Sequence, residues 1–255
     1  MNINQIKDKI VLGIQNYCKN NHFQDVILGL SGGLDSALVL ALACEALGNH
    51  HVHTLMMKTK YTSIKSIQLA QKIAAINHVE HKVLDIQPLV ELTLNTFDFK
   101  PQNPLTEQNI QARIRGNILM AYSNEKKYLP LACSNKSEIS LGYCTLYGDT
   151  CGGLAPIGDV YKTTVYQLAA LYNQKNKYPI PEEIINRIPT AELALNQKDT
   201  DSLPPYEVLD DILKKYIYNN NPIPKDKKDF IESIKKQYEK NSFKRQQLPP
   251  IILID

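Results

Sequence analysis

The chain has 255 residues, of which 43% are apolar and 22% charged, the balance of an ordinary globular protein. Its net charge of +3 is too small to indicate a nucleic-acid partner. No apolar run reaches the roughly 18–20 residues that span a bilayer, so we expect no membrane segment. The five cysteines include no C-x-x-C pair, which predicts reduced thiols and a cytoplasmic location.

Hydrophobic periodicity predicts strands that alternate with helices over the first half of the chain. The expected elements are a helix at 2–20, a strand at 25–30, a helix at 34–47, a strand at 52–57, a helix at 64–76, a strand at 79–86, a helix at about 107–126 and a strand at 129–133. Short strands separated by helices indicate a parallel sheet with helices on both faces, a Rossmann-like α/β fold. In such a sheet the ligand site lies at the carboxyl ends of the strands.

Beyond Gly153 the expected elements are mostly helical. We expect helices at 162–172, 181–186, 206–218 and 225–240, and loops at 178–181, 201–205 and 219–224. The sequence contains no internal repeat. We therefore predict a single domain over residues 1–255, with an α/β core at about 20–175 and a mainly helical C-terminal part at about 176–255.

The most informative motif is Ser31-Gly32-Gly33-Leu34-Asp35-Ser36, between the first expected strand of the sheet and the helix that follows it. Two glycines let the backbone turn sharply, so that its N–H groups and the helix N-terminus can bind an anion. The serine hydroxyls are further donors, and Asp35 suits a magnesium ion. The motif is neither a Walker loop nor a dinucleotide fingerprint. The plain alternative is a glycine-rich turn with Asp35 in the first turn of a helix.

This loop resembles the signature of the ATP pyrophosphatases, which cleave ATP between the α and β phosphates. That superfamily includes GMP synthetase, argininosuccinate synthetase, asparagine synthetase, tRNA-modifying enzymes and NAD synthetase. The loop alone does not choose among them.

Four later segments resemble those of NAD synthetases. They are residues 106–117, then 134–138 with 142–149, then 156–163, and finally 189–193 with Gln197, Asp199 and 203–206. The resemblance covers about residues 10–250 and favours the synthetase domain of the glutamine-dependent branch, without the amidase domain that normally precedes it. We therefore expect a stand-alone enzyme that uses free ammonia, or an excised domain. A separate glutaminase partner remains open.

The resemblance implies amidation of deamido-NAD to NAD with ATP, Mg²⁺ and ammonia. In this reaction the carboxylate attacks the α-phosphorus of ATP, pyrophosphate leaves, and ammonia then displaces AMP from the acyl adenylate. It also implies an adenine nucleotide alpha-hydrolase-like fold and a homodimer that holds deamido-NAD at its subunit interface.

The resemblance also assigns roles to individual residues. For ATP these are Gly29, Leu30, Ser31, Gly32, Gly33, Leu34, Asp35, Ser36, Met56, Arg113, Cys133, Lys162 and Thr190. For deamido-NAD they are Asn109, Arg113, Glu138, Tyr143, Cys144, Thr145, Leu146, Phe243 and Lys244. Magnesium is assigned to Asp35 and Glu138. The catalytic residues are Asp149, which would bind ammonium and accept a proton, and Lys162, which would contact phosphate.

Each charged residue also has a plain structural alternative. Asp149 suits a tight turn, Glu138 a helix start and Lys162 an exposed helix face. Arg113 and Arg115 are both compatible with a solvated helix face. At each of these positions, considered alone, the structural alternative explains the residue as well as the functional role does.

The sequence departs from the family pattern at three positions. Cys133 replaces the usual threonine, and the loss of one hydrogen bond to ATP is worth about 1 kcal/mol. Leu146 and Gly153 stand where the ammonia-only branch often carries lysine and aspartate. These departures put the corresponding contacts in doubt.

Two other kinds of protein compete with the synthetase. Another ATP pyrophosphatase, such as a tRNA thiolase or the GMP-forming enzyme, would share the loop, but the thiolases use paired cysteines and a basic RNA surface. A regulatory protein that binds nucleotide without catalysis would not need Asp35, Glu138, Lys162 and Asp149 together. Production of AMP distinguishes it from an enzyme.

Overall fold

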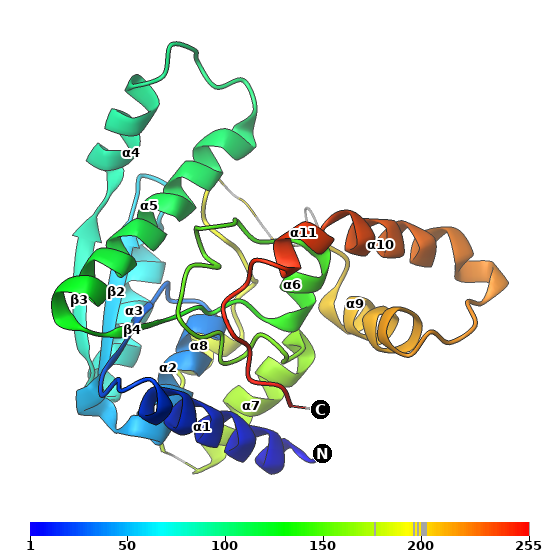
Figure 1. Cartoon of the computed structure of the whole chain (residues 1–255), viewed down its shortest axis with the longest axis horizontal. Helices are drawn as coiled ribbons and strands as arrows, with labels where there is room; N and C mark the ends of the chain where they lie inside the picture. The colour runs from blue at the N-terminus through cyan, green and yellow to red at the C-terminus, as the bar shows by residue number, and fades with distance from the viewer. Residues whose placement is uncertain (176, 196, 198, 200–202, 255) are drawn as a thin grey trace.

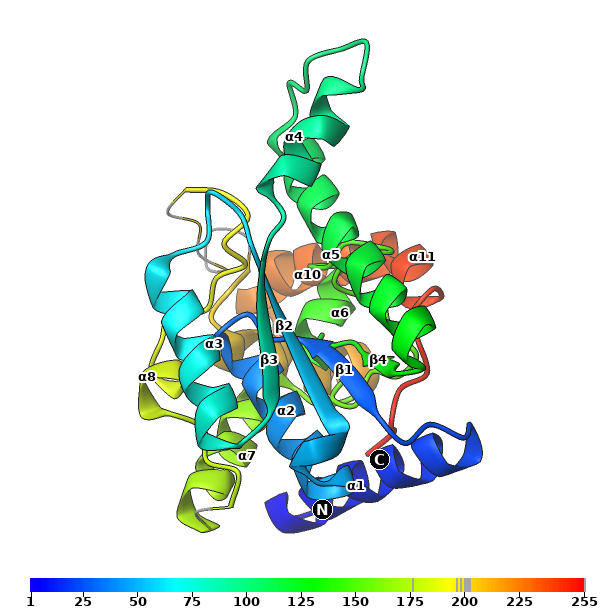
Figure 2. The ribbon, with the colours of Figure 1, turned by 90° about the vertical axis from the view of Figure 1, so that its left-hand side faces the viewer.

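The computed structural model of the chain describes residues 1–175, 177–195, 197, 199 and 203–254. At its centre lies a parallel sheet of four strands in the order β3-β2-β1-β4 (Figure 2). The strands are β1 Val26–Gly29, β2 Val52–Lys58, β3 Glu80–Asp85 and β4 Leu129–Leu131. Because β2 and β3 extend the sheet to one side of β1 and β4 to the other, the strand order reverses beside β1.

Helices cover both faces of this sheet (Figure 1). Those of the α/β part are α1 Ile3–Asn20, α2 Leu34–Leu47, α3 Ile64–Ile76, α4 Gln87–Asn95, α5 Pro104–Lys126, α6 Lys136–Leu141 and α7 Lys162–Lys175. Adjacent residues of β1 point to opposite faces. Leu28 packs in the main core with α1, α2, α3 and α7, whereas Ile27 packs against α5 through Leu119.

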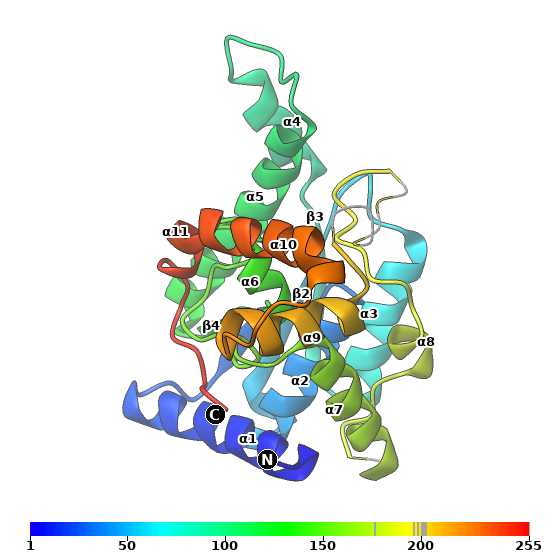
Figure 3. The same cartoon turned by 90° about the vertical axis from the view of Figure 1, so that its right-hand side faces the viewer.

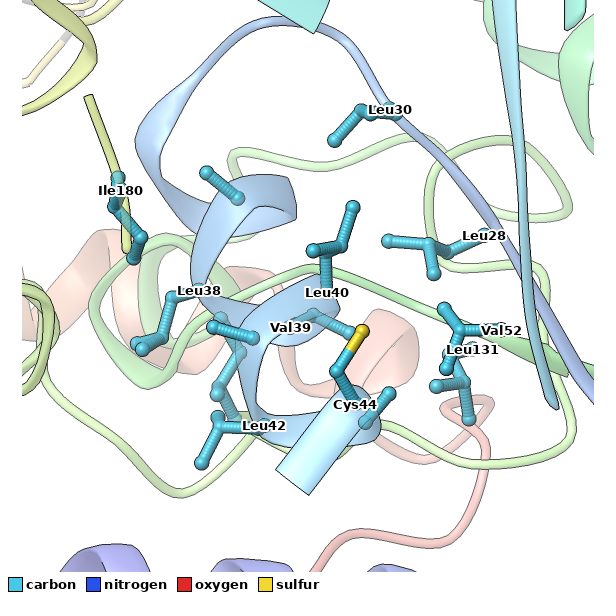
Figure 4. Packing of buried hydrophobic residues seen from close by; sticks show 14 of the residues in the cluster. Leu28, Leu30, Leu38, Val39, Leu40, Leu42, Cys44, Val52, Leu131 and Ile180 are labelled. Carbon is cyan, nitrogen blue, oxygen red and sulfur yellow. The ribbon is translucent and has the colours of Figure 1, made fainter. Parts of the chain in front are cut away.

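Helix α2 is the centre of the main core. Leu38, Leu40 and Leu42 are all fully buried, and Figure 4 shows them surrounded by side chains of neighbouring elements. A helix that is apolar on every side must be enclosed by protein. This explains why the sequence Leu34–Leu47 lacks a polar stripe, and it fixes the N-terminus of α2 rigidly under the glycine loop.

The C-terminal part forms a second, smaller core. Its helices are α8 Glu182–Ile185, α9 Tyr206–Ile212, α10 Lys228–Lys240 and α11 Ser242–Arg245, with a π-helical turn at Leu213–Tyr218 and a 3₁₀ turn at Lys225–Lys227. A further 3₁₀ turn, Asn49–His51, joins α2 to β2 in the α/β part. Leu209 of α9 and Ile231 of α10 pack against Leu141 of α6, beside which both helices lie (Figure 3). The chain then returns to the α/β part, where Ile251 pairs with Ala155.

The predicted α/β fold with a parallel sheet is confirmed, and the four expected strands are all present. Helix α4 follows β3 directly and was not among the expected elements. The predicted helix at 206–218 changes to π-helical hydrogen bonding at Leu213. Positions 201 and 202 of the predicted loop 201–205 lie outside the described residues. No helix in the described part of the chain is long and apolar enough to cross a membrane.

The central position of α2 gives a test of this packing. Replacement of fully buried Leu40 by alanine is expected to lower the free energy of unfolding by about 2–5 kcal/mol, because it removes apolar contacts and leaves a cavity. Leu12 of α1 is 54% exposed and serves as the control, with an expected loss below about 0.5 kcal/mol for Leu12→Ala. Urea denaturation measures both variants. Equal losses would contradict the assigned core.

Candidate active site

A cavity of about 550 Å³ opens at the carboxyl ends of the strands, beside the reversal in strand order. Its volume lies in the range of small-molecule sites. Most of the predicted site residues line it: Gly29, Leu30, Ser31, Gly33, Leu34, Asp35, Ser36, Met56, Asn109, Cys133, Glu138, Tyr143, Cys144, Thr145, Asp149, Lys162, Thr190 and Lys244. Four predicted residues do not: Gly32, Arg113, Leu146 and Phe243. The individual roles remain predictions.

The glycine loop is held closed by its own serines. The Ser31 and Ser36 hydroxyls lie 3.1 Å apart, and the Ser36 hydroxyl donates to the Gly33 carbonyl at 3.1 Å. The Gly33 N–H donates to Ser31 Oγ at 3.2 Å. These bonds orient the first turn of α2, whose residues line the cavity and whose first N–H groups have no partner within the helix. The loop is therefore preformed for an anion.

Gly32 has a structural reason to be glycine. Its φ is +77°, a conformation that side chains rarely adopt, and a Cβ there would collide with the Ser66 carbonyl oxygen of α3. Gly32 therefore shapes the loop from behind instead of lining the cavity.

One buried lysine joins the two carboxylates that were predicted to bind metal. The Lys162 side chain is 2% exposed, and its ammonium donates to Asp35 Oδ2 and, at 3.2 Å, to Glu138 Oε1. Asp35 also accepts from the Asn135 side chain at 3.0 Å, and Asn135 caps α6, which carries Glu138. The plain alternative for Lys162, an exposed helix face, is therefore wrong.

The pKa values of Lys162 and Glu138 depend on their burial and on the charges around them. Burial alone would lower the pKa of Lys162, but Asp35 and Glu138 outweigh it, and the pKa is raised. Burial raises the pKa of Glu138, and Asp35 and Asp199 add to this while Lys162 opposes it. Three carboxylates face a single lysine, so the site as a whole attracts further positive charge.

Tyr206 and Asp199 also belong to this cluster, although the family segments that contain them predicted no role for either residue. The Tyr206 hydroxyl lies 3.1 Å from Glu138 Oε1 and 2.9 Å from Asp199 Oδ2. The Lys162 ammonium lies 5.1 Å from the centre of the Tyr206 ring, within the range of a cation–π contact. Tyr143 also reaches Asp199, at 3.3 Å. Sequence spacing gave no signal for the contact between Tyr206 and Glu138, because the two residues are 68 positions apart.

The donor set suits magnesium. Asp35 and Glu138 offer hard carboxylate oxygens to the same cavity and already bind one cation between them, the Lys162 ammonium. Among the described residues there is no group of three or more acidic, histidine or cysteine side chains placed to hold a metal. Magnesium commonly takes one or two carboxylates and completes its shell with phosphate and water. The two carboxylates therefore fit a metal that arrives with a phosphate ligand.

Asp149 and the loop before it form the other wall of the cavity. Asp149 Oδ1 accepts from the Thr145 N–H at 2.6 Å, and the Thr145 hydroxyl donates to Asn109 of α5 at 2.7 Å. Burial raises the pKa of Asp149, while the Thr145 N–H and the charge of Lys244 oppose the shift. Asp149 lines the cavity and is bonded to its own loop, so its turn contact leaves the predicted functional role possible.

The tail and Cys133 complete this wall. Lys244 donates to the Gly142 and Cys144 carbonyls at 2.7 and 2.6 Å, whereas Phe243 is 50% exposed and points elsewhere. Burial raises the pKa of Cys133, so its thiol stays protonated and is a poor nucleophile.

The two arginines of α5 face different surroundings. Arg113 is exposed, lies outside the cavity and donates through Nε to the Leu146 carbonyl at 3.2 Å. Arg115 lines the cavity, donates to the Met57 carbonyl at 3.0 Å, and burial lowers its pKa to about 10. Residues two apart on a helix point about 200° apart. Arg115 is therefore the charged residue of α5 that lines the cavity, and no role was predicted for it.

Arg187, for which no role was predicted either, lines the cavity near Thr190. Arg187 donates to the Ser66 hydroxyl at 2.7 Å and pairs with Glu192 at 2.6 Å. The Thr190 hydroxyl accepts from the Glu192 N–H at 3.2 Å and donates to the Gln197 carbonyl at 2.5 Å. These bonds hold residues 187–193 against α3.

A model of the NAD synthase family matches residues 6–248. The chain belongs to the NAD synthase family. The glutamine-dependent NAD(+) synthetase of Thermotoga maritima is 44% identical over 247 residues, which make up 93% of this chain and 43% of that protein. The corresponding protein of Acinetobacter baylyi is 42% identical over 254 residues, 96% of this chain and 47% of that protein. The chain thus spans less than half the length of these curated relatives.

Solved structures of NAD synthase relatives include stand-alone chains. The NH3-dependent NAD synthetase of Campylobacter jejuni is 31% identical with a TM-score of 0.75 and covers 98% of this chain and 99% of that one. The NMN synthetase of Francisella tularensis is 25% identical with a TM-score of 0.83 and 96% coverage of each chain. A glutamine-dependent synthetase of Acinetobacter baumannii, solved with ADP, is 38% identical with a TM-score of 0.69, over 95% of this chain and 45% of that one.

The clash behind the phosphate loop gives a prediction for Gly32. Gly32→Ala is expected to weaken ATP binding at least about tenfold, because the loop must move away from Ser66 and lose its closed shape. Gly48→Ala is the control, since Gly48 also has a positive φ, +90°, but open space around it. Both variants should lose about 1–2 kcal/mol of stability from strain. Calorimetric titration with ATP separates them, and equal ATP affinities would contradict the assignment.

The buried lysine gives a prediction that depends on pH. Lys162→Met is expected to lower the free energy of unfolding by about 3–5 kcal/mol at pH 8, because it leaves buried carboxylates without their cation. The pKa of Glu138, which burial already raises, then loses the opposing charge of Lys162 and rises further, so stability is lost as pH rises through the raised value. Urea denaturation at pH 5 should show a smaller loss.

Lys175→Met, at the exposed end of the same helix, is the matched control and should show little change at either pH. A loss for Lys162→Met that is the same at pH 5 and pH 8 would contradict the charge balance described here.

Proposed function

We propose that this member of the NAD synthase family amidates deamido-NAD to NAD, using ATP and ammonia. The observation that carries the proposal is that the phosphate loop, Lys162 and Asp149 all face one cavity. Family membership and the relative solved with ADP support an adenine nucleotide as co-substrate. Free ammonia as the nitrogen source is supported by the match to the ammonia-dependent enzyme over 99% of its chain. The free cysteines agree with a cytoplasmic location.

The first step is activation of the nicotinate carboxylate. One of its oxygens forms a bond to the α-phosphorus of ATP while the bond to the bridging oxygen breaks and pyrophosphate leaves. Ser31, Ser36 and the N-terminus of α2 bind phosphate oxygens, and the Lys162 ammonium stabilises the charge that builds up on them. Mg²⁺, when held by Asp35 and Glu138, would supply further positive charge to the same phosphates.

The second step is amination of the acyl adenylate. Ammonia forms a bond to the acyl carbon, the bond from that carbon to the AMP oxygen breaks, and AMP leaves. Asp149 binds ammonium and accepts a proton, which makes free ammonia available as the nucleophile. Burial raises the pKa of Asp149 above the ordinary value of an aspartate, which makes it a stronger base.

A second candidate substrate is the mononucleotide counterpart of deamido-NAD. The structural match to the NMN synthetase, at a TM-score of 0.83, favours this alternative. The chemistry at the carboxylate would be the same for both substrates. The two substrates would differ only in the part of the molecule beyond the ribose. The assay below compares the two substrates.

We also propose a homodimer with deamido-NAD at the subunit interface. Arg113 is exposed on α5 and free to reach a ligand held by a second subunit. Exposed apolar side chains lie on α4 and on the segment that joins it to α5, with Leu92 of α4 at 66% and Phe99 of the joining segment at 56% exposure. A purely monomeric species at micromolar concentration in sedimentation would contradict the dimer.

The test is an assay of NAD and AMP with ATP, Mg²⁺ and each carboxylate substrate, with ammonium or glutamine as nitrogen source. We expect NAD and AMP in equal amounts from deamido-NAD and ammonium, a lower kcat/KM for the mononucleotide, and no product from glutamine. Lys162→Met should abolish the reaction, whereas Lys175→Met should not. ATP binding without AMP formation from either substrate would contradict the proposal and favour a nucleotide-binding regulatory protein.

A further inference from the structure

Helix α9 places a second polar side chain on the face that bears Tyr206. Asp210 lies four residues after Tyr206, one turn of the helix further on, and is 1% exposed. Its position is set by the C-terminal core, in which the neighbouring Leu209 is fully buried. Asp210 belongs to none of the predicted sites and does not line the cavity.

The Asp210 carboxylate connects the starts of two helices. Oδ1 accepts from the Ser137 hydroxyl in the first turn of α6, and Oδ2 accepts from the Thr163 N–H in the first turn of α7 at 2.9 Å. Ser137 Oγ in turn accepts from the Lys162 N–H at 2.9 Å. The first N–H groups of a helix have no partner within the helix, so Asp210 and Ser137 together cap α7.

The residues next to these contacts are the ones that carry the charge cluster. Glu138 follows Ser137 on α6, and Lys162 precedes Thr163 on α7. The cap therefore fixes the backbone at both charged residues at the same time.

The chemistry of Asp210 argues against a purely structural role. Its partners in the described part of the chain are hydroxyl and amide donors, with no lysine or arginine within ion-pair distance. Burial of a carboxylate without a cation costs stability. In return, an ionised carboxylate forms stronger hydrogen bonds than a neutral group and orients both donors at once.

We propose that Asp210 is a positioning residue, which holds Lys162 and Glu138 at the separation that the phosphate chemistry requires. The inference rests on the proposed function, because it assigns the alignment to that reaction. Misplacement of a reacting group by about 1 Å can reduce the rate by about 100-fold. A relaxed α7 start would move the Lys162 ammonium relative to the phosphates while leaving the loop at residues 31–36 in place.

The experiment compares Asp210→Ala with Asp211→Ala. Asp211 is the next residue of α9, has a side chain 53% exposed and forms an ion pair with exposed Lys215. We expect Asp210→Ala to lower kcat by about 100-fold with a change in the KM for ATP below about threefold, and Asp211→Ala to leave both unchanged. Asp210→Asn, which keeps the shape and one acceptor, should recover part of the lost kcat.

Two further variants keep the test decisive if Asp210→Ala fails to fold. Ser137→Ala should lower kcat in the same way, because it interrupts the contact with the Lys162 N–H. The double variant Ser137→Ala with Asp210→Asn should be no worse than the more impaired single variant, since both act through one network. If the double variant instead lost kcat by the product of the two single losses, the residues would act independently and the shared network would be overturned.

A second measurement does not depend on the proposed function. Hydrogen exchange of a peptide that contains residues 160–165 should be faster in Asp210→Asn and Ser137→Ala than in the parent protein, and unchanged in Asp211→Ala. If the parent protein makes no NAD, the proposed function fails, and the exchange data still test the positioning role. The inference is overturned if these variants exchange like Asp211→Ala, or if thermal stability falls while kcat per folded molecule is unchanged.

Discussion

The structure depends most on the contact between the Lys162 ammonium and the carboxylates of Asp35 and Glu138. Each of these residues sits at the start of a different helix, so the contact joins α2, α6 and α7 at one point beside the sheet. Alone, any of the three charges would be costly to bury. Together with Asp199 they leave a surplus of negative charge, which explains why the cavity is suited to a metal ion bound with phosphate rather than to phosphate alone.

The rest of the fold serves to keep this point fixed. Helix α2 is enclosed on all sides and cannot shift, so the phosphate loop has a rigid base. The C-terminal helices contribute from the opposite direction, because Tyr206 and Asp210 reach the cluster or its supports from one face of α9. The mainly helical C-terminal part is therefore coupled to the chemistry although its own core lies outside the sheet.

The sequence allowed prediction of the fold class, the strands, the glycine loop and part of the cavity lining, because their signals are local. Short apolar runs, glycines before a helix and the ordered family segments all appear within a few residues. Residues that act from a distance carried no such signal. Asp210 belongs to no motif. The resemblance assigned ligand contacts to Arg113 and none to Arg115, whereas α5 places Arg115 and not Arg113 along the cavity. Tyr206 lay in a quoted motif, but its partner Glu138 is 68 residues away.

The central claim is that this cavity activates a carboxylate by bonding it to the α-phosphorus of ATP. The most direct measurement follows the carboxylate oxygen itself, using deamido-NAD labelled with ¹⁸O in the nicotinate carboxylate together with ATP, Mg²⁺ and ammonium. Mass spectrometry of the products should find one labelled oxygen in AMP for each NAD formed, and none in pyrophosphate. Label in pyrophosphate or in inorganic phosphate, or NAD formed with unlabelled AMP, would contradict the account.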